Sequence, residues 1–241
     1  MALNSISYFK LAATMMGLLV STSVANTARA ISHELAQRYA DAVVDPVLAI
    51  ARSTKEPIRI YYSAACNANC NSFYEAPVPF PKVSVQRPAH GHDAFAMLRE
   101  MFRTDSQVSV AKGRDGIIRI SIGQVPTTLL DTMVSMPKLS DQERYNPLQM
   151  FTTVRDTAEM TRAMRVLRFT MVDNAAGDRA VPQPGLPHLP SAAAHVTVNR
   201  LLDTIAVTWK GQGLVIYGVC NTPNEGDRPF LLDYIGGISR K

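Results

Sequence analysis

Apolar residues in the middle of the chain recur with two different periods. They occupy every second position in three short segments, the spacing of strands with one buried face, at 82–86, 107–111 and 117–122. Helical spacing begins after Asp93, a residue type that caps helices, and returns after Val125 and Pro126. The pattern predicts the order β-α-β-β-α, with helices over 94–102 and 125–134.

The flanking segments add elements of both kinds. Before the central unit, apolar spacing predicts two short helices, after Ser32 and through Leu48, and a strand over 57–63. After it, Asn146 and Pro147 predict the cap and first turn of a long helix. The remaining predicted elements are strands at 168–172, 213–220 and 230–234 and a helix at 198–209. The sequence therefore predicts an α+β fold, a small mixed β-sheet packed by helices, with a βαββα core unit and a helical N-terminal segment.

The first thirty residues have the layout of a secretory signal peptide. Lys10 precedes an apolar run over 11–20, and a small, polar stretch ends in Ala28-Arg29-Ala30. The run is shorter than the roughly 20 apolar residues that span a bilayer. We expect cleavage after Ala30, no stable membrane span afterwards, and a periplasmic or secreted protein; the alternative is a retained N-terminal anchor.

Three parts follow from this layout. The signal peptide occupies 1–30, and a helical and strand segment with a cysteine loop occupies 31–81. An α+β domain is expected over 82–241, interrupted by a loop at 174–194 that is rich in Pro, Ala and Gly. No N-x-S/T acceptor occurs, which suits export in a Gram-negative bacterium at least as well as a eukaryotic route.

Composition and charge exclude some classes of function. The chain is 46% hydrophobic and 19% charged, which argues against disorder. Its formal net charge is +5, and removing Lys10 and Arg29 with the signal peptide lowers this to +3. A surplus this small, without a run of Lys or Arg, predicts no nucleic-acid partner.

The three cysteines suggest a disulfide in an oxidising compartment. Cys66 and Cys70 flank Asn67-Ala68-Asn69, a sequence that favours a tight turn, so this pair is the disulfide candidate. Cys220 ends an apolar strand and is expected to be a buried thiol. A bridge from Cys220 to Cys66 or Cys70 is the alternative, and spacing does not choose between them.

Few residues have the arrangement of a catalytic or metal site. His90, His92 and Asp93 form the one local group of metal-type ligands, but Asp93 is also the expected helix cap. His188 and His195 are isolated in the sequence and are expected at the surface. No nucleophile elbow, P-loop, dinucleotide fingerprint or H-E-x-x-H motif is present, so no catalytic residue and no cofactor is predicted.

The segment 82–134 resembles the short N-terminal (STN) domain shared by secretins and TonB-dependent receptors. Val83 to Ala89 is similar to that family's first strand and turn, and Ala94 to Phe102 to its first helix. Ile118 to Leu130 resembles its later strand, turn and second helix. Leu129 stands where the family usually has Ala, and a closing strand would have to come from 214–219. The resemblance implies a module that binds a partner protein at the cell envelope.

These observations favour a non-enzymatic function. The leading hypothesis is a periplasmic interaction or assembly module of an envelope machine, such as a secretion or TonB-type system, whose partner is an envelope protein. One alternative is an exported hydrolase or metal-dependent enzyme that uses His90, His92 and Asp93. Another is a periplasmic protein that binds a small ligand. The first predicts an open strand edge or apolar patch, and the enzyme predicts a cleft where titratable groups converge.

Overall fold

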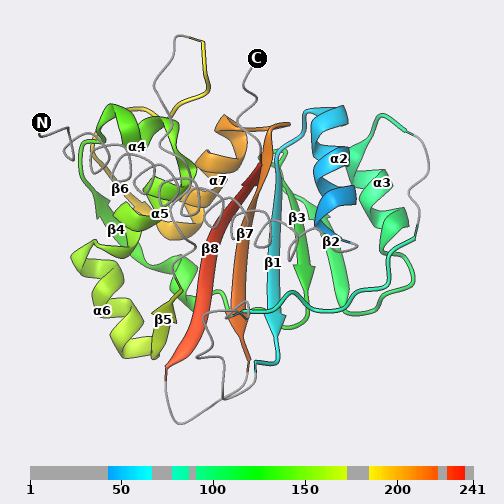
Figure 1. The fold of residues 1–241 in the computed structure, drawn as a ribbon, viewed down its shortest axis with the longest axis horizontal. Coiled ribbons are helices and arrows are strands. Elements are labelled where there is room, and N and C mark those ends of the chain that lie inside the picture. The colour runs from blue at the N-terminus through cyan, green and yellow to red at the C-terminus, as the bar shows by residue number, and fades with distance from the viewer. Residues whose placement is uncertain (1–42, 67–77, 87–90, 173–184, 222–226, 237–241) are drawn as a thin grey trace, which may run out of the picture. The chain divides into compact units, whose positions relative to one another are not determined.

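The computed structural model describes residues 43–66, 78–86, 91–172, 185–221 and 227–236 (Figure 1). The predicted signal peptide, the helix after Ser32, and the residues Cys70 and His90 lie outside the described residues. Most of the loop predicted at 174–194 lies outside them as well. The fold is α+β, as the hydrophobic pattern predicts.

A six-stranded mixed sheet forms the centre of the described part, in the order β2-β3-β1-β7-β8-β5. Its strands are β1 (Ile58–Ala64), β2 (Val108–Lys112), β3 (Ile118–Ile122), β5 (Phe169–Met171), β7 (Gly213–Cys220) and β8 (Arg228–Gly236). β1 is parallel to both β3 and β7, and the three arrowheads point the same way in Figure 1. β2 and β8 run antiparallel to β3 and β7, and β5 pairs with β8 in parallel.

β1 and β7 are the two middle strands of the sheet. Every residue of both strands is buried, as expected for central strands covered on two faces. β3 alternates buried and half-buried residues, so one of its faces is less covered. β1 contributes to two apolar clusters, with Tyr61 in one and Ile60 in the other. The segment before residue 82 is therefore part of the same sheet as the domain after it.

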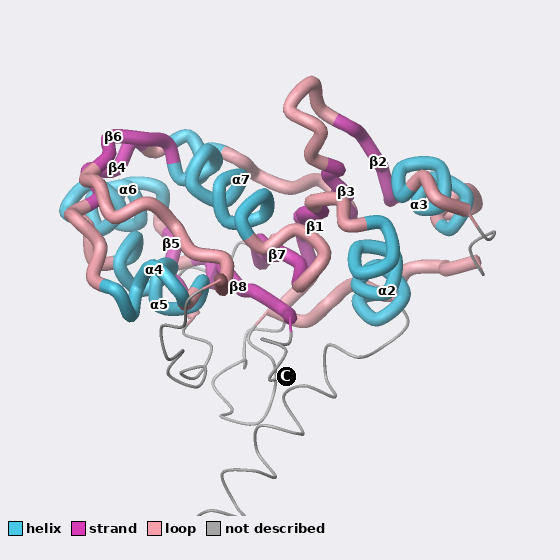
Figure 2. Tube along the Cα trace, turned by 90° about the horizontal axis from the view of Figure 1, so that it is seen from above, coloured by secondary structure: helices cyan, strands magenta, loops and turns pink. Residues whose placement is uncertain are grey.

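Helices cover the two faces in separate groups, which Figure 2 shows from above. α2 (Val44–Thr54) and α3 (Ala94–Met101) pack on the face of Ile60. α5 (Pro147–Arg155), α6 (Ala158–Leu167) and α7 (Val198–Thr208) pack on the face of Tyr61. The short α4 (Asp141–Tyr145) precedes α5. Within the described residues, no helix combines the length and apolar character needed to span a membrane.

Polar caps define the helix starts that the sequence indicates. The Asp93 carboxylate accepts from the backbone N–H of Phe95 at 2.9 Å, and the Asn146 side chain accepts from Leu148 at 3.0 Å. The long helix predicted after Pro147 is two helices, because Thr157 caps a new one by accepting from the Met160 N–H.

The prediction of a helix over 125–134 is wrong. A 3₁₀ turn, η1 (Thr128–Asp131), is followed by strand β4 (Met133–Met136), which pairs with β6 (Ala194–Thr197) in a second sheet. Val134 and Met136 are buried while Met133 and Ser135 are exposed, which is strand periodicity. The strand partner lies about sixty residues away, so local spacing could not reveal it.

The strand predicted over 82–86 is also wrong. This segment has no ladder partner among the described residues and is held at the end of α3 instead. The backbone N–H of Gln86 donates to the Met101 carbonyl at 2.9 Å, and that of Ser84 donates to the Asp105 carboxylate at 2.8 Å. The segment 214–219, considered as the closing strand of an STN-like unit, pairs with β1 and β8.

The disulfide joins Cys66 to Cys220, which corrects the candidate pair Cys66–Cys70 and the buried thiol expected at Cys220. The register of β1 and β7 places Ala64 opposite Cys220. Cys66 follows two residues later, and its Cα lies 5.5 Å from that of Cys220, within the range a disulfide requires. A disulfide is compatible with an exported protein.

Candidate functional site

The predicted metal ligands do not form a metal site in the part that the structure describes. His92 and Asp93 are both exposed, and the Asp93 carboxylate caps α3. Among the described residues, no group of three or more His, Cys, Asp or Glu side chains could hold a metal ion. His90 lies outside these residues, so the complete H-x-H-D group is not tested.

A pocket of about 660 Å³ lies at the carboxyl ends of the parallel strands. β1 contributes Ser63 and Ala64, while Gly123 and Asn221 follow β3 and β7 directly. In open α/β sheets, ligands commonly bind outside the carboxyl ends of parallel strands. The described residues that line it are Ser63, Ala64, Ala65, Pro79, Phe80, Pro81, Ser106, Gln107, Gly123, Gln124 and Asn221.

Backbone contacts fix the rim of this pocket. The N–H of Asn221 donates to the Ala64 carbonyl at 2.7 Å, and the N–H of Gly123 donates to the Gln107 carbonyl at 2.9 Å. Ala65 and Asn221 each adjoin a cysteine of the disulfide. The strand ends are therefore held together by both hydrogen bonds and a covalent bond.

Ser63 and Gly123 lie next to each other in this pocket. The Ser63 hydroxyl is buried and has no hydrogen-bond partner in the structure. Gly123 has a φ of +73°, and a Cβ built there would lie 2.7 Å from Ser63 Oγ. Glycine is thus required both by the backbone conformation and by the space that Ser63 occupies.

The lining supplies polar groups without charge. None of the described residues that line the pocket is an Asp, Glu, His, Lys or Arg. Acid–base catalysis needs a titratable group within hydrogen-bond reach of the reacting atoms. The cleft that the enzyme hypothesis requires, in which such groups converge, is not formed by these lining residues.

A second cluster joins Ser135 of β4, His195 of β6 and Glu159 of α6. Ser135 Oγ donates to Glu159 Oε1 at 2.5 Å and lies 3.2 Å from His195 Nδ1. The hydrogen bond from Ser135 lowers the pKa of the Glu159 carboxyl. No sequence signal marks this cluster, because His195 has no neighbouring ligand-type residue in the sequence.

The order of contacts in this cluster differs from a catalytic triad. In a triad, histidine lies between serine and the carboxylate and accepts the serine proton. Here the single Ser135 hydrogen is donated to Glu159, so His195 Nδ1 is left to donate to Ser135 Oγ. Ser135 and His195 are also exposed. The geometry does not activate Ser135 as a nucleophile.

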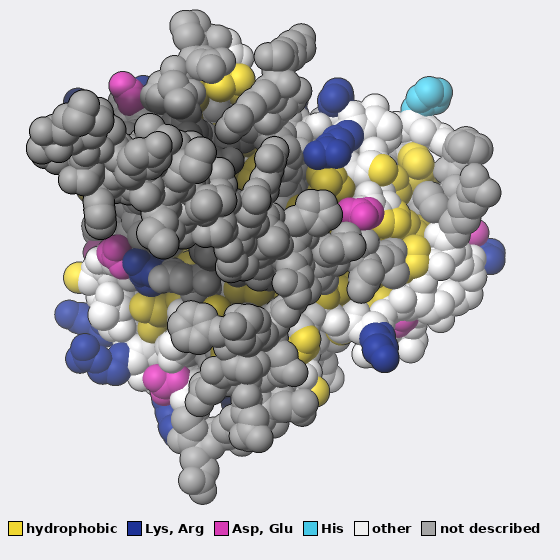
Figure 3. Space-filling view, viewed as in Figure 1, with side chains coloured by type: hydrophobic (Ala, Val, Ile, Leu, Met, Phe, Trp, Pro, Cys, Tyr) yellow, Lys and Arg dark blue, Asp and Glu magenta, His cyan; other side chains and the backbone are white. Residues whose placement is uncertain are grey.

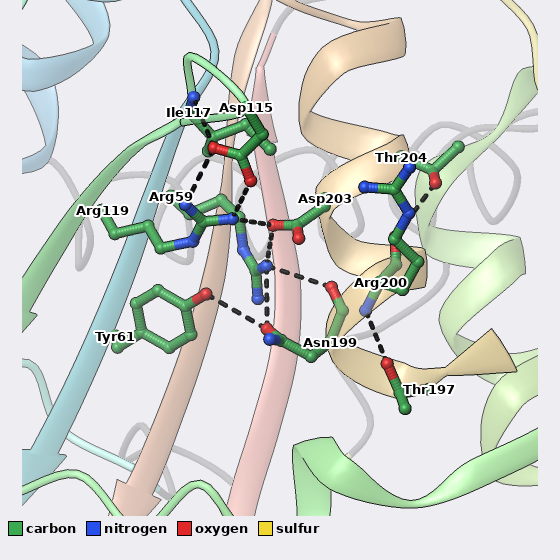
Figure 4. A network of polar contacts seen from close by, with 10 residues as sticks. All are labelled: Arg59, Tyr61, Asp115, Ile117, Arg119, Thr197, Asn199, Arg200, Asp203 and Thr204. Carbon is green, nitrogen blue, oxygen red and sulfur yellow. Dashed lines mark hydrogen bonds and ion pairs between the residues drawn. The ribbon is translucent and has the colours of Figure 1, made fainter. Parts of the chain in front are cut away.

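The most extensive buried polar network lies between β1 and α7 (Figure 4). Arg59 is 1% exposed and forms an ion pair with Asp203. Its Nη1 also donates to the carbonyl and side-chain oxygens of Asn199, at 3.1 and 3.0 Å. The guanidinium lies 4.6 Å from the ring centroid of Tyr61, while Nη2 has no hydrogen-bond partner in the structure.

Arg119 extends this network to the β2–β3 turn. Its Nη2 lies 2.9 Å from Asp203 and 2.6 Å from Asp115. Burial lowers the pKa of Arg59, an effect that the neighbouring Tyr61 and Asp203 oppose. The hydrogen bond from Arg119 lowers the pKa of Asp115 to about 2. The charges of the two arginines and two aspartates cancel formally. Because Asp203 belongs to α7 and both arginines belong to strands, the network ties α7 to the sheet.

Among the described residues, β2 is an edge strand of the main sheet, with one side that no other strand pairs with. Gly123 donates to the Gln107 carbonyl and Gly113 donates to the Ile117 carbonyl, which fixes the phase of the antiparallel ladder. The backbone groups of Ser109 and Ala111 therefore face β3, and those of Val110 and Lys112 face outward. Among the described residues, none forms a hydrogen bond with these outward groups.

The charges on one face of the molecule can be followed in Figure 3. On this face, Lys and Arg side chains lie at several separate places, with acidic and apolar side chains between them. This distribution agrees with the small net charge of the chain.

Comparison with protein-family models, curated proteins and solved structures gave no match. The resemblance of 82–134 to the STN domain therefore stays an expectation from the sequence.

Proposed function

We propose that this protein is an exported, non-enzymatic interaction module, and that it binds an envelope protein by adding one strand of its partner to β2. The observation that carries the proposal is the open outer edge of β2. Strand addition gives affinity through main-chain hydrogen bonds, which any extended segment can supply. The resemblance to the STN domain implies the same kind of role.

The backbone of β2 is suited to pairing. The N–H groups of Val110 and Lys112 and the carbonyls of these residues point away from β3. β2 contains no proline, and its register with β3 is unbroken over five residue pairs. An incoming strand would continue the ladder beside Val110.

Side chains leave this edge accessible. Val108 and Val110 pack towards the apolar cluster under α2 and α3, while Ser109 and Ala111 are small and exposed on the other face. Natural edge strands often carry a lysine that discourages pairing. Lys112 is the lysine of β2, and its Nζ lies 2.7 Å from Glu56, so its charge is partly neutralised.

The opposite edge of the sheet is less suitable. β5 has three residues, whereas β2 has five. Very short edge strands are one device by which proteins avoid unwanted pairing. The proposal therefore assigns the partner to β2.

Photo-crosslinking in intact cells of the native host tests this proposal. A photo-reactive residue replaces Ser109 on β2, and the matched control replaces Thr170, which is exposed on β5. We expect one discrete envelope protein to be trapped from Ser109 and not from Thr170. Equal trapping from both sites, or none from Ser109, would overturn the proposal.

A proline substitution on β2 tests strand pairing at its outer edge independently of the stability of the fold. Val110→Pro removes an outward N–H, which the β2–β3 ladder does not use, and proline is tolerated at such edge positions. We expect it to reduce the Ser109 adduct at least tenfold while the melting temperature stays close to that of Val110→Ala. If Val110→Pro melts with the parent yet still forms the adduct, strand addition at β2 is excluded.

A further inference from the structure

We infer that the pocket at the carboxyl ends of β1, β3 and β7 binds a neutral saccharide. Three carboxamides on its rim carry the inference: Gln107, Gln124 and Asn221. All three residues are exposed, and no described residue forms a hydrogen bond with their side-chain carboxamides. A carboxamide both donates and accepts, as does each sugar hydroxyl, so the two match in hydrogen-bonding chemistry.

The absence of charge on the described lining selects against ionic ligands. A phosphate or carboxylate is normally held by Arg, Lys or a helix N-terminus, and a cationic ligand by carboxylates or aromatic cages. The lining residues supply serines, carboxamides, prolines, alanines, a glycine and one phenylalanine. A neutral ligand avoids burying a charge without a partner.

Phe80 supplies the apolar part of the site. Its ring is half-buried and lies 4.6 Å from the Tyr62 ring, measured between centroids. The Tyr62 hydroxyl donates to the Val78 carbonyl at 2.9 Å, so this tyrosine holds the segment that carries Phe80. An aromatic ring beside amide groups suits the alternating C–H and hydroxyl surface of a pyranose.

The volume of the pocket suits a compact ligand. The volume of about 660 Å³ falls within the usual range of small-molecule sites, roughly 300–1,000 Å³. Its lining includes the buried Ser63 hydroxyl, which has no hydrogen-bond partner among the described residues. A ligand hydroxyl, or a water held beneath the ligand, would satisfy a polar group whose burial is otherwise unfavourable.

Ligand-observed NMR on the full mature chain tests the inference. The probes are maltose, cellobiose and N,N′-diacetylchitobiose, with glucose 6-phosphate and an uncharged, blocked trialanine peptide as comparisons. We expect saturation transfer to at least one neutral disaccharide at millimolar concentration, and weaker transfer to the sugar phosphate and the peptide. No transfer to any neutral disaccharide, or preferential binding of the peptide or the phosphate, would overturn the inference.

Substitutions then locate the binding. Gln124→Ala and Asn221→Ala should each weaken the best disaccharide about fivefold, the effect of one lost hydrogen bond. Ala65→Trp should abolish binding by filling the mouth. Gln142→Ala, at an exposed position of α4, is the matched control and should leave the affinity unchanged. Equal affinity in Gln124→Ala, Asn221→Ala and the control would place the sugar elsewhere. Saccharide binding at the pocket and crosslinking at β2 are separate measurements, so either proposal can fail without the other.

Discussion

Arg59 of β1 and Asp203 of α7 form an ion pair with side chains 1% and 9% exposed. The pair joins the central strand to the helix that covers it, across 144 residues of sequence. A charge at this depth is stable only while its partner remains, because an isolated buried ion is very unfavourable. The packing of α7 on the sheet therefore depends on both Arg59 and Asp203.

Removing one member of this pair should be strongly destabilising. We expect Asp203→Ala to lower the free energy of unfolding by about 3–5 kcal/mol, because Arg59 is left buried without its main counter-charge. The double substitution Arg59→Met with Asp203→Leu should recover most of this loss, since it removes both charges. Urea denaturation of the parent and the two variants measures both effects, and a loss below about 1 kcal/mol for Asp203→Ala would contradict the role assigned to the pair.

The disulfide should contribute a large part of the stability. Cys66 and Cys220 are separated by 154 residues, so their bond closes a long loop in the unfolded chain. We expect Cys220→Ser to cost about 2–5 kcal/mol under oxidising conditions, and a reductant to lower the parent to the same level. Cys70→Ser is the control and should leave stability and the Cys66–Cys220 peptide unchanged. Recovery of a Cys66–Cys70 peptide from the oxidised parent would contradict the pairing.

Asp115 should make stability depend on pH in acid. Arg119 lowers the pKa of its carboxyl from 3.8 to about 2 in the folded protein. Since the folded pKa is the lower one, the stabilisation is present above pH 3.8 and is lost as the pH falls towards 2. The side chain is 33% exposed, so solvent screening limits the contribution to about 1 kcal/mol or less.

Asp115→Asn tests this dependence. The variant should melt slightly below the parent at pH 6 and converge with it near pH 2, as followed by circular dichroism. An unchanged difference in melting temperature across that range would show that the carboxylate charge is not responsible.

Asp93 should behave as a helix cap. Its carboxylate accepts from Phe95 N–H, so Asp93→Ala should destabilise the protein by about 1 kcal/mol, while Asp93→Ser should recover most of the loss. A metal ligand would behave differently, because serine is a poor replacement for a carboxylate ligand. Thermal melts with and without zinc separate these roles, and zinc stabilisation that both variants lose would favour the metal site.

Local sequence determined most of the helices and strands. Asp93 and Asn146 indicate helix starts, because their side chains accept hydrogen bonds from backbone N–H groups only two or three residues away. The continuous apolar run of β7 indicates a strand buried on both faces, and this run is also a local property of the sequence. Such features are encoded within a few residues and are visible without the fold.

Segments whose structure depends on a distant partner were predicted poorly. Leu129 and Leu130 are buried in a 3₁₀ turn and would be buried in a helix as well, so their spacing could not exclude a helix over 125–134. What decides this region is the pairing of β4 with β6. The strand expected at 82–86 failed because alternating valines can pack against a core without a ladder partner.

The candidate sites show the same division. The chain already shows, without its fold, the signal-peptide pattern, the α+β class, the caps and the lack of a local catalytic motif. Folding is needed to see that Cys66 bonds Cys220, that Ser135 contacts His195, and that Ser63 and Asn221 line one pocket. These contacts depend on strand order and register, which arise from the packing of the whole chain and leave no fixed spacing in the sequence.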